Sequence, residues 1–192
     1  ILPIMKLAIL VSGGGSNLQS ILDAIDSGEL KNTQVEIVIA DRDCYAIERA
    51  LEKDIPVFLL ERGENLSGEI DELLSGQSVD LIVLAGFLSI LSIGFCEKWR
   101  GRMINIHPSL LPKFGGKGMY GAKVHQAVLD AGETESGATV HFVTPGVDEG
   151  EIIIQESFPV DKGDAVTDLQ HKVQSVEQKI LIHAISKISS GK

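Results

Sequence analysis

Apolar residues follow two spacings along the first half of this 192-residue chain, and stretches of the two kinds alternate. Four short, almost continuous apolar runs predict buried strands, at residues 6–11, 35–40, 56–60 and 79–86. Between the runs, apolar side chains three or four positions apart predict helices, the first ending before Gly28 and two more at residues 45–53 and 69–74. Strands that alternate with helices predict a parallel sheet with right-handed crossovers.

The pattern changes in the second half of the chain. Residues 102–106 predict a short strand that His107 and Pro108 end, and residues 123–131 predict a helix. Residues 138–143 alternate as a strand and residues 152–155 return, which predicts an antiparallel hairpin with a long connection. A long helix follows at about residues 164–188. The sequence therefore predicts an α/β fold whose sheet is mostly parallel.

Composition bounds the possible functions. With 44% hydrophobic and 23% charged residues, the chain has the composition of one globular domain. The net charge of −10 argues against nucleic acid as a general partner, because phosphate backbones require a basic surface. Cys44 and Cys96 lack metal-ligand or CxxC spacing, so we expect buried free thiols and a cytoplasmic location. The apolar residues 1–4 are too few for a signal peptide or a membrane span.

A glycine-rich turn at residues 12–17 joins the first strand to the first helix. Glycines permit close approach by a ligand, and the N–H groups of a helix N-terminus favour phosphate. The turn is neither a GxGxxG fingerprint, which would need glycine in place of Leu18, nor a Walker A sequence. Ser16 and Asn17 suit a single phosphate monoester. The alternative is a tight turn in which Ser16 or Asn17 caps the helix.

Asn105 and His107 form the most distinctive polar pair. They alternate with Ile104 and Ile106, so a strand would place both polar side chains on one face. They also lie at the carboxyl end of a predicted strand, where ligands bind in open α/β sheets. Asn can donate and accept hydrogen bonds, and His can change charge near neutral pH. The alternative is a hydrogen-bonded loop anchor.

Four other features have two interpretations each. The apolar residues 86–91 suit either a flat ligand pocket or ordinary packing, and the glycine-rich residues 113–121 suit either a mobile loop of the site or a solvated connector. Asp148 is a turn residue unless its loop faces His107. Glu177 falls inside the apolar stripe of the last helix, where it must either pair with Lys or Arg or meet a cationic ligand.

Together these segments closely resemble the folate-dependent formyltransferase family. The matching segments occur in family order, at residues 12–18 (SGGGSNL), 84–88 (LAGFL), 105–112 (NIHPSLLP) and 140–143 (VHFV) with Asp148. The resemblance is to members that transfer the formyl group of 10-formyltetrahydrofolate to the amino group of glycinamide ribonucleotide in de novo purine biosynthesis. It implies a single domain, residues 1–192, with the Rossmann-like formyltransferase fold: a mostly parallel twisted sheet, helices on both faces and an antiparallel C-terminal strand pair.

The resemblance also implies roles for individual residues. It implies catalysis by Asn105, His107 and Asp148. For the ribonucleotide, it implies a phosphate site at the backbone of Gly15, Ser16 and Asn17, a contact of Glu177 with the glycinamide end, and further contacts with Leu88, Ile106 and Pro108. For the folate, it implies contacts with Leu88, Ser89, Ile90, Leu91, Asn105, Val143, Thr144, Val147 and Asp148. The chain departs from the family at Ser89, where arginine is frequent, and near Gly68, where a basic residue is missing.

The chemistry implied by the resemblance is direct attack of the substrate amine on the formyl carbon, which gives a tetrahedral oxyanion. Asn105 would donate a hydrogen bond to this oxygen, and protonated His107 would stabilise it and later supply a proton. Asp148 would raise the pKa of His107. No metal and no covalent enzyme intermediate is required. The expected partners are the two small molecules alone, without nucleic acid or membrane, and both a monomer and a homodimer remain open.

Three alternative functions remain. A formyltransferase that acts on initiator tRNA would need a basic C-terminal RNA-binding domain, and a formyltetrahydrofolate hydrolase would need a regulatory domain, which is not expected before Met5. The third is a non-catalytic folate or nucleotide binder on the same fold. The joint presence of Asn105, His107 and Asp148 argues against the last alternative.

Overall fold

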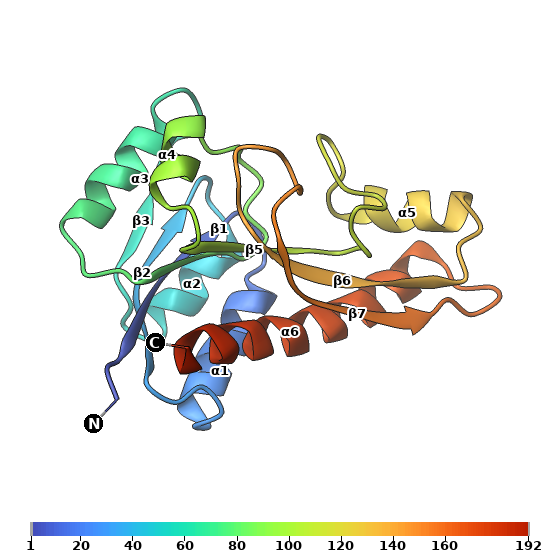
Figure 1. Ribbon diagram of the computed structural model, residues 1–192, viewed down its shortest axis with the longest axis horizontal. Helices are drawn as coiled ribbons and strands as arrows, with labels where there is room; N and C mark the ends of the chain where they lie inside the picture. Colours follow the sequence, from blue (N-terminus) through green and yellow to red (C-terminus); the bar gives the residue numbers. More distant parts are fainter. Residues whose placement is uncertain (1, 192) are drawn as a thin grey trace.

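A seven-stranded sheet forms the centre of the computed structural model, which describes residues 2–191 (Figure 1). The strand order is β3-β2-β1-β4-β5-β6-β7. The strands are β1 (Met5–Val11), β2 (Thr33–Ala40), β3 (Val57–Leu59), β4 (Leu81–Leu84), β5 (Met103–His107), β6 (Glu135–Phe142) and β7 (Ile152–Pro159). Neighbours among β1 to β5 are parallel, whereas β6 and β7 are antiparallel to their neighbours. The predicted mostly parallel sheet with an antiparallel C-terminal pair is confirmed.

Helices cover both faces of the sheet (Figure 1). One face packs against α1 (Ser16–Asp26), α2 (Tyr45–Leu51) and α6 (Val166–Ser190), and the other against α3 (Leu66–Ser75) and α4 (Ile93–Lys98). The remaining helix, α5 (Ala122–Asp130), lies beside α6. In β1, Leu7 and Ile9 join the first of these cores while Ala8 and Leu10 join the second. Both faces of β1 are buried, and its residues 7–11 form a continuous apolar run.

The predicted elements are present, but several ends differ. The sequence did not predict α4, because six residues are too few to show a helical period; its N-cap is Ser92, whose Oγ accepts a hydrogen bond from the N–H of Phe95 at 3.2 Å. β5 continues through His107, which pairs with Thr139 of β6, and β7 continues well beyond Gln155. Pairing with β6 thus extends both strands beyond what their own patterns indicate.

The sheet topology places two loops side by side. After β1 the chain crosses to β2 on one side, whereas after β4 it crosses to β5 on the other side. β1 and β4 are paired neighbours, with Leu10 opposite Leu84, so their carboxyl ends open a crevice between residues 12–17 and residues 85–91. Such a switch point is the usual ligand site of an open α/β sheet. Between residues 2 and 191, no helix is both long and apolar enough to cross a membrane.

Candidate active site

A cavity of about 810 Å³ lies at this crevice, a volume typical of small-molecule sites. Every residue that the sequence predicts for catalysis or binding lines it: Gly15, Ser16, Asn17, Leu88, Ser89, Ile90, Leu91, Asn105, Ile106, His107, Pro108, Val143, Thr144, Val147, Asp148 and Glu177. The fold thus brings together segments that are up to 162 positions apart in the chain, from residue 15 to residue 177.

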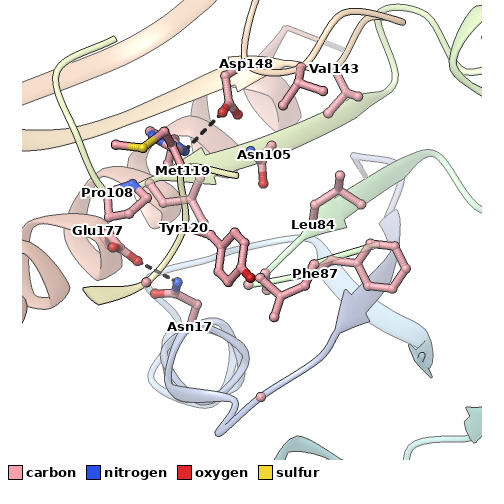
Figure 2. Close-up of a pocket in the computed structure, with 18 of the residues that line it drawn as sticks. Asn17, Leu84, Phe87, Asn105, Pro108, Met119, Tyr120, Val143, Asp148 and Glu177 are labelled. Carbon is pink, nitrogen blue, oxygen red and sulfur yellow. Dashed lines mark hydrogen bonds and ion pairs between the residues drawn. The ribbon is translucent and has the colours of Figure 1, made fainter. Parts of the chain in front are cut away.

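The two ends of the cavity differ in chemistry (Figure 2). Asn17 and Glu177 lie at one end, beside the start of α1, and Leu84 and Phe87 lie at the other. Asn105 lies between the two ends. This arrangement can hold a polar group at one end and a flat apolar group at the other, with a hydrogen-bond donor between them.

Gly15 forms the N-cap of α1 and has a φ of 78°, in the left-handed region that favours glycine. A Cβ atom at this position would lie 2.8 Å from the Cα and Cβ atoms of Ala46, so the turn also lacks room for a side chain. No side-chain hydrogen bond caps the helix. The alternative in which Ser16 or Asn17 caps α1 is therefore wrong.

The side chain of Asn17 instead donates from Nδ2 to Oε2 of Glu177 at 3.0 Å (Figure 2). Among the described residues no Lys or Arg forms an ion pair with Glu177, so the predicted alternative of a structural ion pair is wrong. Burial raises the pKa of Glu177, and the hydrogen bond from Asn17 offsets only part of this rise. A carboxylate in this position favours a cationic or hydrogen-bond-donating ligand.

Asp148 lies close to His107, as its predicted role requires. The Nδ1 atom of His107 is 3.4 Å from Oδ2 of Asp148, and its Nε2 is 2.9 Å from the carbonyl oxygen of Phe114. A carbonyl oxygen only accepts, so Nε2 carries a proton. The N–H of Gly116 donates to the same Asp148 oxygen at 3.0 Å. The glycine-rich residues 113–121 are therefore held by hydrogen bonds to both His107 and Asp148.

The protonation of this pair is set by opposing effects. Burial lowers the pKa of His107, and the Asp148 carboxylate and the Phe114 carbonyl only partly offset this. The expected upward effect of Asp148 is present, but burial outweighs it, so the pKa lies below the ordinary histidine value. Burial alone would raise the pKa of Asp148, but His141 in its charged form, the His107 charge and the Gly116 N–H together lower it. Asp148 is thus ionised at neutral pH.

His141 lies between Asn105 and Asp148, two of the three predicted catalytic residues, although the sequence analysis gave it no role. Its Nδ1 is 3.0 Å from the carbonyl oxygen of Phe142, which requires a proton on Nδ1 and leaves Nε2 to accept from Nδ2 of Asn105 at 3.2 Å. Asn105 then retains a second Nδ2 hydrogen for a ligand. Oδ1 of Asp148 is 3.6 Å from the same Nε2. The available signal was a lone polar residue between Val140 and Phe142.

Asp41, a buried carboxylate, holds residues 86–91, which form the apolar wall of the cavity. Asp41 accepts hydrogen bonds from Ser12 Oγ at 2.7 Å and from Ser89 Oγ at 2.5 Å, and Ser12 Oγ accepts from the N–H of Leu88 at 2.9 Å. Burial would raise the pKa of Asp41, but hydrogen bonds from Arg42, Ser89 and Ser12 lower it. The Ser89 hydroxyl is therefore engaged with Asp41, and residues 86–91 are held in a defined shape.

Other lining residues were not predicted. Residues 116–121 form part of the wall, which favours a loop of the site over a solvated connector. From α6, Gln170, His171 and Gln174 join Glu177 in the lining of the cavity. Positions 170, 174 and 177 share one helical face, a signal that the sequence offered.

His125 of α5 is 3% exposed, and its Nδ1 lacks a hydrogen-bond partner within the described chain. No metal-binding group of three His, Cys, Asp or Glu residues occurs among residues 2–191.

The chain is similar to several known proteins. It is 39% identical to the human (Homo sapiens) trifunctional purine biosynthetic protein adenosine-3 over 97% of this chain and 18% of that protein, and it spans less than a fifth of several such longer relatives. It is 37% identical to the phosphoribosylglycinamide formyltransferase of Haemophilus influenzae, over 97% of this chain and 88% of that protein. The crystal structure of glycinamide ribonucleotide transformylase 1 from Symbiobacterium toebii superposes with a TM-score of 0.90 at 36% identity, covering 98% of this chain and 89% of that one.

The formyl transferase family matches residues 5–185, nearly the whole chain. The matched range includes both ends of the cavity and the Asn105, His107 and Asp148 cluster. On this match, and on the similarity to the Haemophilus enzyme along most of both chains, this chain belongs to the formyl transferase family.

Proposed function

We propose that this chain transfers the formyl group of 10-formyltetrahydrofolate to the amino group of glycinamide ribonucleotide, in de novo purine biosynthesis. The names of its relatives support this reaction. The observation that carries the proposal is that Asn105, His107 and Asp148 line one cavity together with a helix N-terminus and an apolar wall. An enzyme that moves a formyl group from a folate to a phosphorylated amine needs all three of these parts in one cavity.

The ribonucleotide occupies the end of the cavity beside α1. Its phosphate binds the backbone of Gly15, Ser16 and Asn17, where the helix N-terminus supplies N–H groups and partial positive charge. Glu177 contacts the glycinamide end. Ile106, Pro108 and Leu88 complete the walls around the substrate.

The formyl donor occupies the apolar end. Its flat ring system fits the lining contributed by Leu88, Ser89, Ile90 and Leu91 together with the opposite loop, which includes Val143, Thr144 and Val147. Ser89 contributes shape, because its hydroxyl is already bonded to Asp41.

Asn105, His107 and Asp148 carry the chemistry. Asn105 uses its second Nδ2 hydrogen to stabilise the oxyanion that forms when the amine attacks the formyl carbon. His107, protonated at both ring nitrogens, donates its Nε2 proton to the departing nitrogen, after the ligand has displaced the Phe114 carbonyl from that proton. The proton that the attacking amine loses then restores the charged imidazole. Asp148, near Nδ1, favours the protonated imidazole against the effect of burial.

A spectrophotometric assay tests the proposed reaction. The chain is mixed with a 10-formyl folate and glycinamide ribonucleotide, and consumption of the formyl folate is followed. We expect turnover only when the ribonucleotide is present, and a large loss of turnover with His107→Ala. Formate release without the ribonucleotide would instead identify a hydrolase, and binding of both ligands without turnover would identify a non-catalytic binder.

Two further assignments belong to the same proposal. Residues 1–192 form one formyltransferase domain, supported by the family match to residues 5–185. The domain works in a reducing compartment such as the cytoplasm, supported by the free thiols of Cys44 and Cys96.

A further inference from the structure

The carbonyl groups of the glycine turn are held by α2, a helix that contributes no residue to the lining of the cavity. The carbonyl oxygen of Gly13 accepts from the N–H of Ala46 at 3.1 Å. The carbonyl oxygen of Gly14 accepts from Nε of Arg49 at 2.7 Å. Two successive peptide groups of the turn are therefore oriented from the same side, one by backbone and one by a side chain.

Orienting a carbonyl also orients the next N–H group. The peptide bonds of the turn are trans, so the N–H of Gly15 points opposite to the carbonyl of Gly14. Because Arg49 draws that carbonyl toward α2, the Gly15 N–H is directed away from α2. Gly13, Gly14 and Gly15 line the cavity next to the N-terminus of α1, whereas no residue of α2 lines it.

Arg49 is itself fixed by its surroundings. Its Nη1 donates to Oε1 of Gln19 on α1 at 3.3 Å, and its guanidinium lies 4.9 Å from the centre of the Tyr45 ring. The guanidinium thus links α2 to the first turn of α1. It also places a permanent positive charge one hydrogen bond away from the turn. Among the described residues that line the cavity itself, Lys117 is the one Lys or Arg.

We infer that Arg49 is a positioning residue for the substrate phosphate: it sets the direction of the Gly14–Gly15 peptide so that the Gly15 N–H faces the phosphate. Arg49 does this without touching the ligand. The inference rests on the proposed function only in taking the ligand to be a phosphate monoester. It assigns a task to a residue outside the cavity that none of the sequence motifs includes.

Three variants separate hydrogen bonding from charge. Arg49→Met removes both. In Arg49→Gln, the amide Nε2 takes the place of the Arg Nε and can still donate to Gly14, but the charge is lost. Arg49→Lys keeps the charge but has carbon where the Nε donor stood. Arg100→Met is the control, because Arg100 forms an exposed ion pair with Glu97 and does not line the cavity.

The measurement compares glycinamide ribonucleotide with its dephosphorylated riboside, as the ratio of the two KM values. For Arg49→Met we expect KM for the ribonucleotide to rise about tenfold, as after loss of one charge-assisted hydrogen bond. KM for the riboside, KM for the formyl donor and kcat should change by less than about twofold. Arg49→Gln should recover most of the phosphate preference and Arg49→Lys less of it, with Arg100→Met unchanged. Melting temperatures are recorded for all variants.

Two results overturn the inference: Arg49→Met with the wild-type phosphate preference, or Arg49→Gln that loses as much preference as Arg49→Met. If Arg49→Met does not fold, the Gln and Lys variants decide, since better retention by Lys would contradict a role for the Nε donor. A wild-type enzyme without any preference for the phosphorylated substrate is a different result. It would refute the phosphate site of the proposed function itself.

Discussion

Replacing Glu177 by Gln removes one negative charge from the cavity and keeps the size of the side chain. The internal contact survives this change, because the new amide oxygen can still accept from Nδ2 of Asn17, now 3.0 Å from Oε2 of Glu177. The new amide nitrogen can in addition donate to Oδ1 of Asn17, which has no partner within the described residues. Effects on the ligand and on the fold can therefore be separated.

We expect the two effects to have opposite directions. A hydrogen bond to a charged group contributes roughly 1.5–3 kcal/mol, so glycinamide ribonucleotide should bind about 10- to 150-fold more weakly. The fold should become more stable at neutral pH. Because burial raises the pKa of Glu177, the ionised carboxyl destabilises the folded state at pH values above its unfolded pKa, and Gln has no such cost. A gain of about 1 kcal/mol would raise Tm by roughly 2–4 °C in a domain of this size.

Calorimetric titration with each ligand and thermal unfolding at several pH values measure both effects. The gain in Tm should disappear at pH values well below about 4.3, where the carboxyl is protonated in the folded and unfolded states alike. Glu156→Gln serves as the control, because Glu156 pairs with Lys179 at 2.8 Å on the exposed surface and its loss should matter little.

Two results would refute this reasoning. If Glu177→Gln binds the ribonucleotide normally and melts earlier than the wild type at neutral pH, then the carboxylate stabilises the fold and has no part in recognition. A matching loss in formyl-donor affinity would also contradict it, because that ligand occupies the apolar end.

Three further predictions concern the turn and the catalytic pair. Gly15→Ala should lower the free energy of unfolding, measured in urea, by at least about 1–2 kcal/mol, because Gly15 has a φ of 78° and a Cβ atom would contact Ala46. In calorimetry it should weaken binding of the ribonucleotide but not of the formyl donor; equal losses for both ligands would mean that the turn is only structural. Asp148→Asn should lower the pKa of His107 further, so the fall of kcat with rising pH should begin at lower pH; an unmoved profile would exclude this coupling. His107→Ala should reduce kcat by about 10²–10⁴, and adding Asp148→Asn should reduce it little more, whereas losses that multiply would show independent roles.

The parts of the site that follow from local patterns were readable in the sequence. Alternation within one strand placed Asn105 and His107 together, and an acid in an apolar helical stripe marked Glu177. Partners across the sheet were not readable in this way. The pairing of Asn105 with His141 depends on the register between β5 and β6, and the bond from Arg49 to Gly14 depends on how the crossover returns α2 to the turn.

The surroundings of individual side chains could not be predicted from the sequence either. The upward effect of Asp148 on the pKa of His107 follows from charge alone, but the larger downward effect of burial depends on how the whole cavity closes around the ring. In the same way, the predictions for the Asn17 side chain were a phosphate contact or a helix cap, whereas it donates to Glu177 because α6 packs against α1.

The hydrogen bond between Asn17 and Glu177 joins residues 160 positions apart, and so links the first helix to the last. A ligand bound at this junction must be released before α6 can detach from α1. At a concentration 100 times its Kd, the ribonucleotide should therefore slow amide hydrogen exchange in α6 by up to about 100-fold wherever exchange requires that detachment. The helix α3 contributes no residue to the cavity, so its local openings should continue at the same rate. We therefore expect a supply of substrate also to lengthen the time for which the final helix is protected from proteases.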